Sequence, residues 1–122
     1  MIVEPIIGSA AIRLAVAPEL RGRLALLAVG RPLIIDYYAA RLRGVAVGDV
    51  VVSFGEPGPE PCYIELEPID DVAVLAERHL VGLLEGATLR EAGPPWHRHL
   101  ALYLARAEDW IGFLDRHSSR RR

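Results

Sequence analysis

Two long apolar stretches with strand character place the strongest constraint on how this chain can fold. Residues 31–38 (RPLIIDYY) show little alternation between apolar and polar positions, which is typical of a strand covered on both faces. Residues 44–54 (GVAVGDVVVSF) are rich in valine, which favours strands. Within them, Gly48-Asp49 predicts either a turn or a bulge. The first stretch is therefore expected to be a central strand of a sheet, and the second to be a further strand.

The other predicted elements are short, and glycine and proline separate them. A short strand opens residues 11–30, and a helix begins near Pro18 and ends at Gly30. Residues 62–68 alternate strictly, with Tyr63 on the polar face, which predicts an edge or half-solvated strand. The remaining predicted elements are a strand over 72–75, a helix ending at Gly86, strands over 87–92 and 97–106, and a helix over 107–117. The fold class is therefore α+β, β-rich, with mixed or antiparallel strands and two to three short helices.

Length and composition predict a single globular domain. We expect the domain to cover residues 1–117, with residues 118–122 forming a disordered, arginine-rich tail. Hydrophobic residues make up 52% of the chain, but no apolar run approaches the roughly 18 residues that a membrane span requires. The first residues lack the features of a signal peptide, so we expect a cytoplasmic, bacterial protein that does not enter a membrane.

Charge and cysteine content exclude two classes of protein. Without the three arginines at 120–122, 11 basic side chains face 16 acidic ones, so binding of nucleic acid by the body of the chain is not expected. Cys62 is the only cysteine, which excludes an intrachain disulfide and an all-cysteine metal site within one chain.

The first candidate site lies in the segment that follows the first long stretch. Arg41 and Arg43 would present guanidinium groups to a small anion, and Tyr37 and Tyr38 would add stacking or a hydroxyl group. If the strand continues, the two arginines share a side. Alternatively, one tyrosine packs inward while the other lies on the surface, and the arginines pair with acids.

The second candidate site is a pair of histidines, His97 and His99. Two imidazoles two residues apart on a strand share a face and can bind zinc, copper or nickel. A third ligand would come from Asp36, Cys62 or His79. The alternative is that the two histidines are ordinary polar surface.

Trp110 and Phe113, on the last predicted helix, are candidate anchors for a protein partner. They are equally compatible with a last layer of the core. No serine lies in a Gly-x-Ser-x-Gly elbow and no glycine-rich loop has the spacing of a phosphate-binding motif. We therefore favour a non-catalytic protein without a cofactor and leave an enzyme as an open alternative.

The order of elements resembles the HesB-like domain of A-type iron–sulfur carriers. The resemblance is carried by residues 70–106, above all by LLEGATL at 83–89, and by IRLAVAPELRGRLALL at 12–27. It implies a HesB-like fold and a tendency to form oligomers. In that family three cysteines hold the cluster, one in a loop after the central strand and two near the C-terminus.

Neither position of the cluster-binding cysteines is occupied by cysteine in this chain. The loop position falls near residues 39–44, where arginines stand, and the C-terminal position falls near or beyond residues 108–117. We therefore expect a non-catalytic HesB-like scaffold or binding protein that has lost cluster binding and forms a homo-oligomer or binds a protein partner. The alternative is a binder of a small anion through Arg41 and Arg43, or of a transition metal through His97 and His99.

Overall fold

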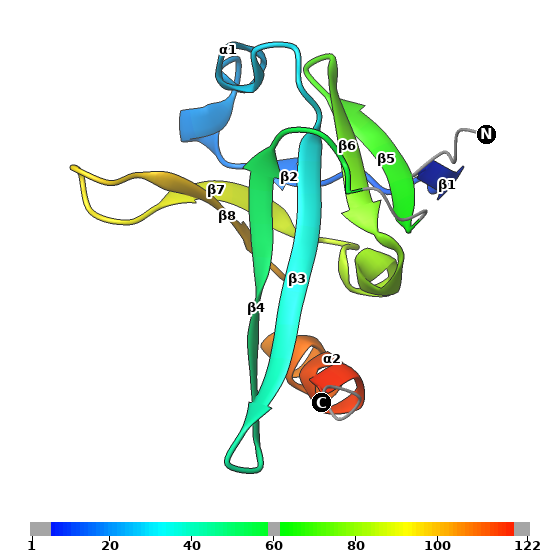
Figure 1. Cartoon of the computed structure of the whole chain (residues 1–122). Coiled ribbons are helices and arrows are strands. Elements are labelled where there is room, and N and C mark those ends of the chain that lie inside the picture. Colours follow the sequence, from blue (N-terminus) through cyan, green and yellow to red (C-terminus); the bar gives the residue numbers. More distant parts are fainter. Residues whose placement is uncertain (1–5, 59–61, 119–122) are drawn as a thin grey trace.

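The computed structural model describes residues 6–58 and 62–118, and within them the chain has the predicted α+β fold with mixed strands and short helices (Figure 1). The strands are β1 (Ile6–Ser9), β2 (Ala15–Val16), β3 (Leu33–Leu42), β4 (Val45–Phe54), β5 (Tyr63–Ile69), β6 (Val72–Glu77), β7 (Thr88–Ala92) and β8 (His99–Tyr103). The helices are the 3-10 helices η1 (Pro18–Leu20) and η2 (Arg78–Leu83) and the α-helices α1 (Leu24–Ala28) and α2 (Ala107–Ser118).

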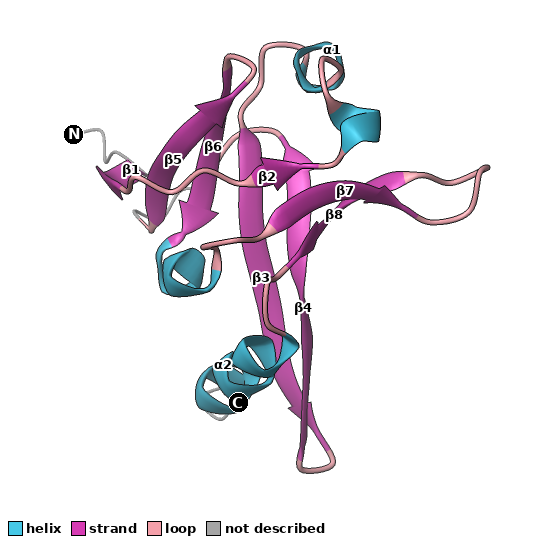
Figure 2. Ribbon diagram, turned by 180° about the vertical axis from the view of Figure 1, so that it is seen from behind, coloured by secondary structure: helices cyan, strands magenta, loops and turns pink. Residues whose placement is uncertain are grey.

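The strands form two mixed sheets. The larger has the order β1-β5-β6-β3-β4, in which β1 is parallel to β5 and β3 is parallel to β6, while the β3–β4 and β5–β6 pairs are antiparallel. The smaller has the order β2-β7-β8, with β2 parallel to β7 and β7 antiparallel to β8. Figures 1 and 2 show the smaller sheet crossing the larger one, with β8 next to β4.

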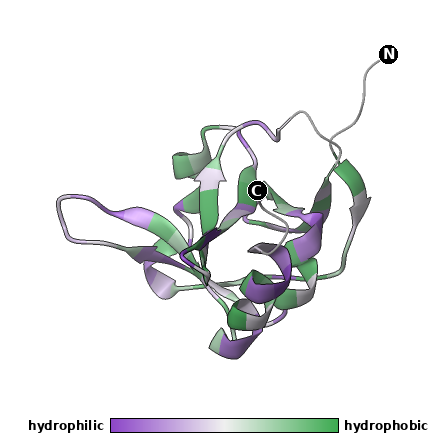
Figure 3. Cartoon of the chain, turned by 60° about the horizontal axis from the view of Figure 1, so that its bottom comes forward, coloured by the Kyte–Doolittle hydropathy of each residue, from purple (hydrophilic) through white to green (hydrophobic). Residues whose placement is uncertain are grey.

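The main core collects apolar side chains from both sheets and from all four helical segments. Leu33 and Ile35 of β3, Val74 of β6, Leu89 of β7 and Phe113 of α2 are among its fully buried members. A smaller cluster on the opposite face of the larger sheet contains Ile34, Tyr63 and Leu75. Hydrophobic and hydrophilic residues alternate along the helices (Figure 3), as expected where one helix face covers a core.

Strands β3 and β4 form a long hairpin whose turn lies elsewhere than the glycine pattern predicted. The ladder continues without a shift through Gly48 and Asp49, so neither a turn nor a bulge occurs there. The turn is Arg43-Gly44, where φ is 53° and 83°, and two positive φ values are the pattern of a type I′ hairpin turn. The hairpin extends β3 to Leu42, well past the predicted strand end at residue 38.

The helix predicted from Pro18 to Gly30 is broken into two pieces. η1 ends at Leu20, Arg21 is extended with ψ of 130°, and Gly22 has φ of 75°, a left-handed conformation that ends a helix. Both pieces still bury a leucine, Leu20 in η1 and Leu24 in α1. The prediction of one continuous helix from Pro18 to Gly30 is therefore wrong.

Two further strands differ from the sequence-based prediction. β5 lies between β1 and β6 and is not an edge strand, so Tyr63 is buried although it alternates with Cys62 and Ile64. β8 begins at His99, because His97 belongs to a turn in which its backbone N–H donates to the Pro94 carbonyl at 2.9 Å.

At the C-terminal end, Ser118 is the last residue of α2 and fully buried, so it does not belong to a tail. The rest of the predicted tail, residues 119–122, lies outside the described residues.

Gly48 lets α2 pack closely on the hairpin. A Cβ atom at this position would lie 2.8 Å from Leu114 Cδ2 and 3.0 Å from the Ala39 Cα, and it would also overlap the Tyr38 carbonyl oxygen. Because two of these neighbours are backbone atoms of β3, the strand has to move to admit a side chain. The absence of a side chain at residue 48 is thus a packing requirement.

We predict that Gly48→Ala destabilises the fold by about 1–3 kcal/mol, because overpacking forces α2 and β3 apart. The matched control is Gly82→Ala, where nothing lies within 4 Å of the added Cβ, and it should leave stability unchanged or slightly raised. Urea unfolding followed by circular dichroism measures both variants. Equal stabilities of the two would contradict the packing role of Gly48.

Candidate functional site

The Arg41 side chain ties the tip of the hairpin to the C-terminal end of α2. Its Nη1 donates to the Gly44 carbonyl at 2.9 Å, and its Nη2 donates to Ser118 Oγ at 3.2 Å and lies 3.3 Å from Asp115 Oδ1. Ser118 is fully buried, so its hydroxyl needs this partner. The guanidinium group of Arg41 therefore has a structural role, which is to connect the hairpin tip to α2.

The four residues of the predicted anion site do not lie together. Tyr37 points to the inner face of β3, where its ring meets Phe113 edge-to-face at 4.9 Å, whereas Tyr38 lies on the outer face and is 58% exposed. Arg43 sits in the turn and does not continue the strand beside Arg41. The arrangement is that of the alternative interpretation, in which one tyrosine packs inward and the other lies on the surface.

The side chains of His97 and His99 lie near each other, although only His99 belongs to β8. Both are exposed, and their ring centroids are 6.3 Å apart. Within residues 6–58 and 62–118 no group of three or more His, Cys, Asp and Glu side chains has a geometry that could hold a metal ion. Of the residues considered as a third ligand, Asp36 lies next to Tyr63, His79 next to Glu77, and Cys62 beside the smaller hydrophobic cluster. Metal binding by this pair stays a prediction.

Trp110 and Phe113 occupy different environments on α2. Phe113 is 1% exposed and belongs to the core, so it corresponds to the core-layer alternative and not to an exposed anchor. Trp110 is half-buried and stacks on Phe113 with ring centroids 5.3 Å apart and an interplanar angle of 16°. Only the Trp110 indole thus keeps an accessible face.

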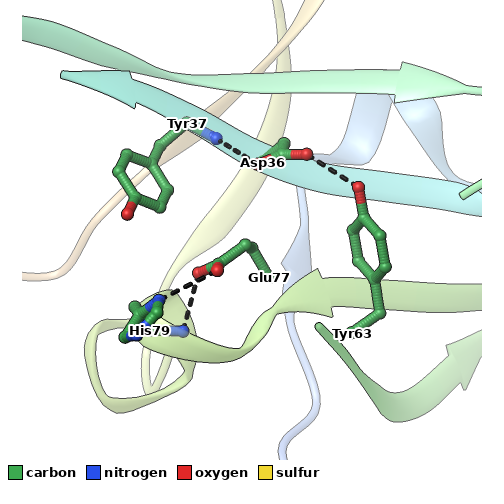
Figure 4. A network of polar contacts seen from close by, with 5 residues as sticks. All are labelled: Asp36, Tyr37, Tyr63, Glu77 and His79. Atoms are coloured by element: carbon green, nitrogen blue, oxygen red, sulfur yellow. Dashed lines mark hydrogen bonds and ion pairs between the residues drawn. The ribbon is translucent and has the colours of Figure 1, made fainter. Parts of the chain in front are cut away.

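The structure reveals a row of polar side chains that the sequence patterns did not single out (Figure 4). Tyr63 and Glu77 are partners across β5 and β6, and Asp36 follows the last register pair of β3 with β6. The Tyr63 hydroxyl donates to Asp36 Oδ2 at 2.8 Å, and the Tyr37 backbone N–H donates to Asp36 Oδ1 at 2.9 Å. The Asp36 carboxylate thus accepts hydrogen bonds from two donors.

Burial, together with the hydrogen bond to Asp36 and its negative charge, raises the pKa of Tyr63 to about 12. The phenol is therefore protonated at neutral pH and acts as a hydrogen-bond donor, not as a base. A buried tyrosine that donates to a carboxylate stabilises the sheet without supplying chemistry.

The second pair in the row is Glu77 and His79. The backbone N–H of His79 donates to Glu77 Oε1 at 2.7 Å, and the Nδ1 atom lies 2.9 Å from Oε2, so the carboxylate caps η2 and orients the imidazole. The His79 ring lies 5.2 Å from that of His117, which stacks on Phe113 at 4.0 Å. In the sequence, Glu77 is visible only as a charged residue at the end of an apolar strand. That pattern predicts neither that it caps η2 nor that His117 lies beside His79.

A carboxylate-oriented imidazole can accept or pass a proton. The ring of His117 lies beside the His79 imidazole and is itself in contact with the rings of Phe113 and Tyr37. The row lies where β5 begins at Tyr63, where β6 ends at Glu77 and where β3 stops pairing with β6.

Comparisons with protein-family models, with curated proteins and with solved structures gave no match. In the described part of the chain, no helix combines the length and apolarity needed to cross a lipid bilayer.

We predict that the Tyr63→Phe substitution costs about 1–2 kcal/mol, because it leaves the Asp36 carboxylate with one donor fewer. Since the folded-state pKa of Tyr63 lies above the ordinary value of about 10, its contribution is fully present below pH 10. That contribution is lost as the pH rises from 10 toward 12. Stability should therefore fall over this range in the wild type and less in the variant.

Denaturant unfolding at several pH values, with ultraviolet titration of the phenols, measures this difference. Tyr38→Phe is the matched control, because Tyr38 is exposed and its substitution should change neither the stability nor its alkaline dependence. The same alkaline loss in Tyr63→Phe as in the wild type would exclude Tyr63 as its source.

We predict that Arg41→Ala lowers stability by about 1–2 kcal/mol, because the buried Ser118 hydroxyl loses its partner and the hairpin tip is released from α2. The ion pair with Asp115 adds little, since the Asp115 side chain is 77% exposed. Arg43→Ala, two residues away in the turn, should change stability by less than about 0.5 kcal/mol. Thermal unfolding of both variants decides; similar losses would contradict the structural role of Arg41.

Proposed function

We propose that this protein is a non-catalytic binding protein on a HesB-like scaffold that lacks an iron–sulfur cluster. We further propose that it binds a protein partner through the outer face of the β3–β4 hairpin. The observation that carries the proposal is a set of four large apolar side chains on that face, which we call the hairpin strip: Tyr38, Leu42, Val45 and Val51, which are 58%, 62%, 61% and 43% exposed.

The register of the hairpin explains why these side chains share a face. Leu42 pairs with Val45, and Val51 pairs with Asp36, which lies on the same face of β3 as Tyr38. Side chains alternate along each strand, so even positions of β3 and odd positions of β4 point outward together. Scattered apolar residues are ordinary on a protein surface, but several on one face of one hairpin are typical of an interaction site.

The position of the hairpin favours the same interpretation. Its tip extends beyond the two sheets, and α2 lies against its inner face, so the outer face stays accessible (Figures 1 and 2). The inner face already supplies the core through Tyr37 and its contact with Phe113. The hairpin strip is therefore apolar surface that does not take part in the core packing of the inner face.

The scaffold part of the proposal is supported by the order of elements. β6, η2, β7 and β8 follow one another as the resemblance implies, a strand leading through a short helical turn into two further strands. The loss of the cluster is supported by the cysteine content, since the chain has one cysteine where the chemistry of the family uses three.

Site-specific photo-cross-linking in cells tests the binding surface without knowledge of the partner. A photoreactive phenylalanine analogue at Val45 or Leu42 should yield covalent protein adducts. The same analogue at Leu26, which is 78% exposed but lies on α1, should not. Adducts of twice the chain mass would identify a second copy, and other masses a different protein. Absence of adducts from the strip, or equal yields at Leu26, would contradict the proposal.

A further inference from the structure

A groove of about 360 Å³ lies where the chain leaves the larger sheet for the smaller one. Before β2 the chain runs beside β5, since the Glu67 N–H donates to the Ile12 carbonyl at 3.0 Å. β2 itself pairs with β7 (Figure 2). The groove occupies the fork between β2 and β5, and Pro68, Ile69 and Asp70 form the side that belongs to β5 and its following turn. We call it the fork groove.

The edge of β2 that faces the fork groove has unused backbone groups. The N–H groups of Ala15 and Ala17 donate to carbonyls of the β7 side at 2.9 Å. Successive strand residues direct their backbone groups to opposite edges, so the N–H and carbonyl of Val16 point away from β7. Val16 lines the groove, and β2 is the edge strand of its sheet in the described chain. It therefore offers one donor and one acceptor to the groove.

Two arginine side chains line the fork groove, Arg13 before β2 and Arg21 after η1. Neither forms an ion pair with a described residue, whereas Arg23, Arg41 and Arg106 do. A guanidinium group has five N–H donors in a planar fork, which suits the oxygens of a phosphate group. The groove thus collects two positive charges that no ion pair balances.

Asp70 is the acid among the residues that line the fork groove. Its Oδ2 accepts from the Gly22 N–H at 3.3 Å, which holds the turn after β5 against the residue that follows Arg21. A carboxylate has further lone pairs with which to accept a hydrogen bond, but it repels an anion that has no hydrogen to donate. The groove therefore favours an anion that both accepts and donates hydrogen bonds.

We propose that the fork groove binds inorganic phosphate. The guanidinium groups of Arg13 and Arg21 and the Val16 N–H donate to phosphate oxygens, and the phosphate O–H donates to the Asp70 carboxylate. Near neutral pH phosphate keeps at least one O–H group, whereas sulfate, an anion of the same shape, has none. No covalent step is involved, and none of the hairpin strip residues lines this groove.

Titration with three tetrahedral dianions tests the proposal. At about pH 8 phosphate keeps one O–H group, whereas methyl phosphate and sulfate have none, and all three carry the same charge. Sodium chloride keeps the ionic strength constant, because salt screens exposed charges. We expect phosphate to bind with a Kd of about 1 mM or below, and at least about threefold tighter than the other two.

Amide chemical shifts of the wild-type protein report where phosphate binds, and they do so independently of the folding of any variant. The changes on adding phosphate should cluster at Val16, Arg21, Gly22 and Asp70, which surround the groove.

Two variants separate the donors from the acceptor. Asp70→Asn keeps the turn, since asparagine tolerates a positive φ such as the 48° of Asp70. It should strengthen sulfate binding and bring the three affinities together, because the repulsion is gone. Arg13→Ala should weaken phosphate binding at least about fivefold. The matched control, Arg43→Ala, removes an exposed arginine outside the groove and should leave phosphate binding unchanged.

Equal affinities of the three anions, or an unchanged preference for phosphate in Asp70→Asn, would overturn the proposal. Equal losses in Arg13→Ala and Arg43→Ala would also overturn it, because they would reflect net charge and not a site. The same holds for shift changes outside the groove, and for absence of phosphate binding at about 10 mM.

Discussion

The continuous register of the β3–β4 hairpin is the constraint on which the other features of this protein depend. Ten residue pairs, from Leu33 with Phe54 to Leu42 with Val45, are joined by a two-residue turn. Because side chains alternate, this register places Tyr37 toward the core and Tyr38 toward solvent. A slip of one residue would exchange the two faces. This register sets the surface on which α2 packs and the position from which Arg41 contacts Ser118. It also brings the residues of the hairpin strip onto one face.

In the larger sheet, the carboxylates of Asp36 and Glu77 each accept more than one hydrogen bond. Asp36 receives a phenol and a backbone N–H, and Glu77 receives a backbone N–H beside the imidazole of His79. Acids at the boundary of a core are costly unless they are satisfied in this way. These hydrogen bonds satisfy both carboxylates where β5 begins, where β6 ends and where the pairing of β3 with β6 stops.

The order and type of the elements were largely legible from the sequence, since apolar periodicity and the glycine and proline breaks are local. The errors arose where a local signal had a distant cause. Gly48 looked like a turn residue, but it is glycine because Leu114 of α2 comes within reach of its Cβ position. Conversely, Gly22 lies inside the segment that was predicted as one helix, yet its left-handed conformation divides that helix. Arg41 and Arg43 do not share a side, because β3 ends at Leu42 and Arg43 lies in the hairpin turn.

By itself the sequence determined that the chain forms a β-rich α+β domain, that the stretch at 31–38 supplies a central strand, and that a cluster held by three cysteines cannot form within one chain. These properties depend on composition and on periodicity along a few residues. Only the tertiary structure decided that Arg41 meets Ser118, 77 residues later, and that Tyr63 meets Asp36 across β6. Such contacts depend on how strands distant in sequence pair and cross, and no local pattern carries that information.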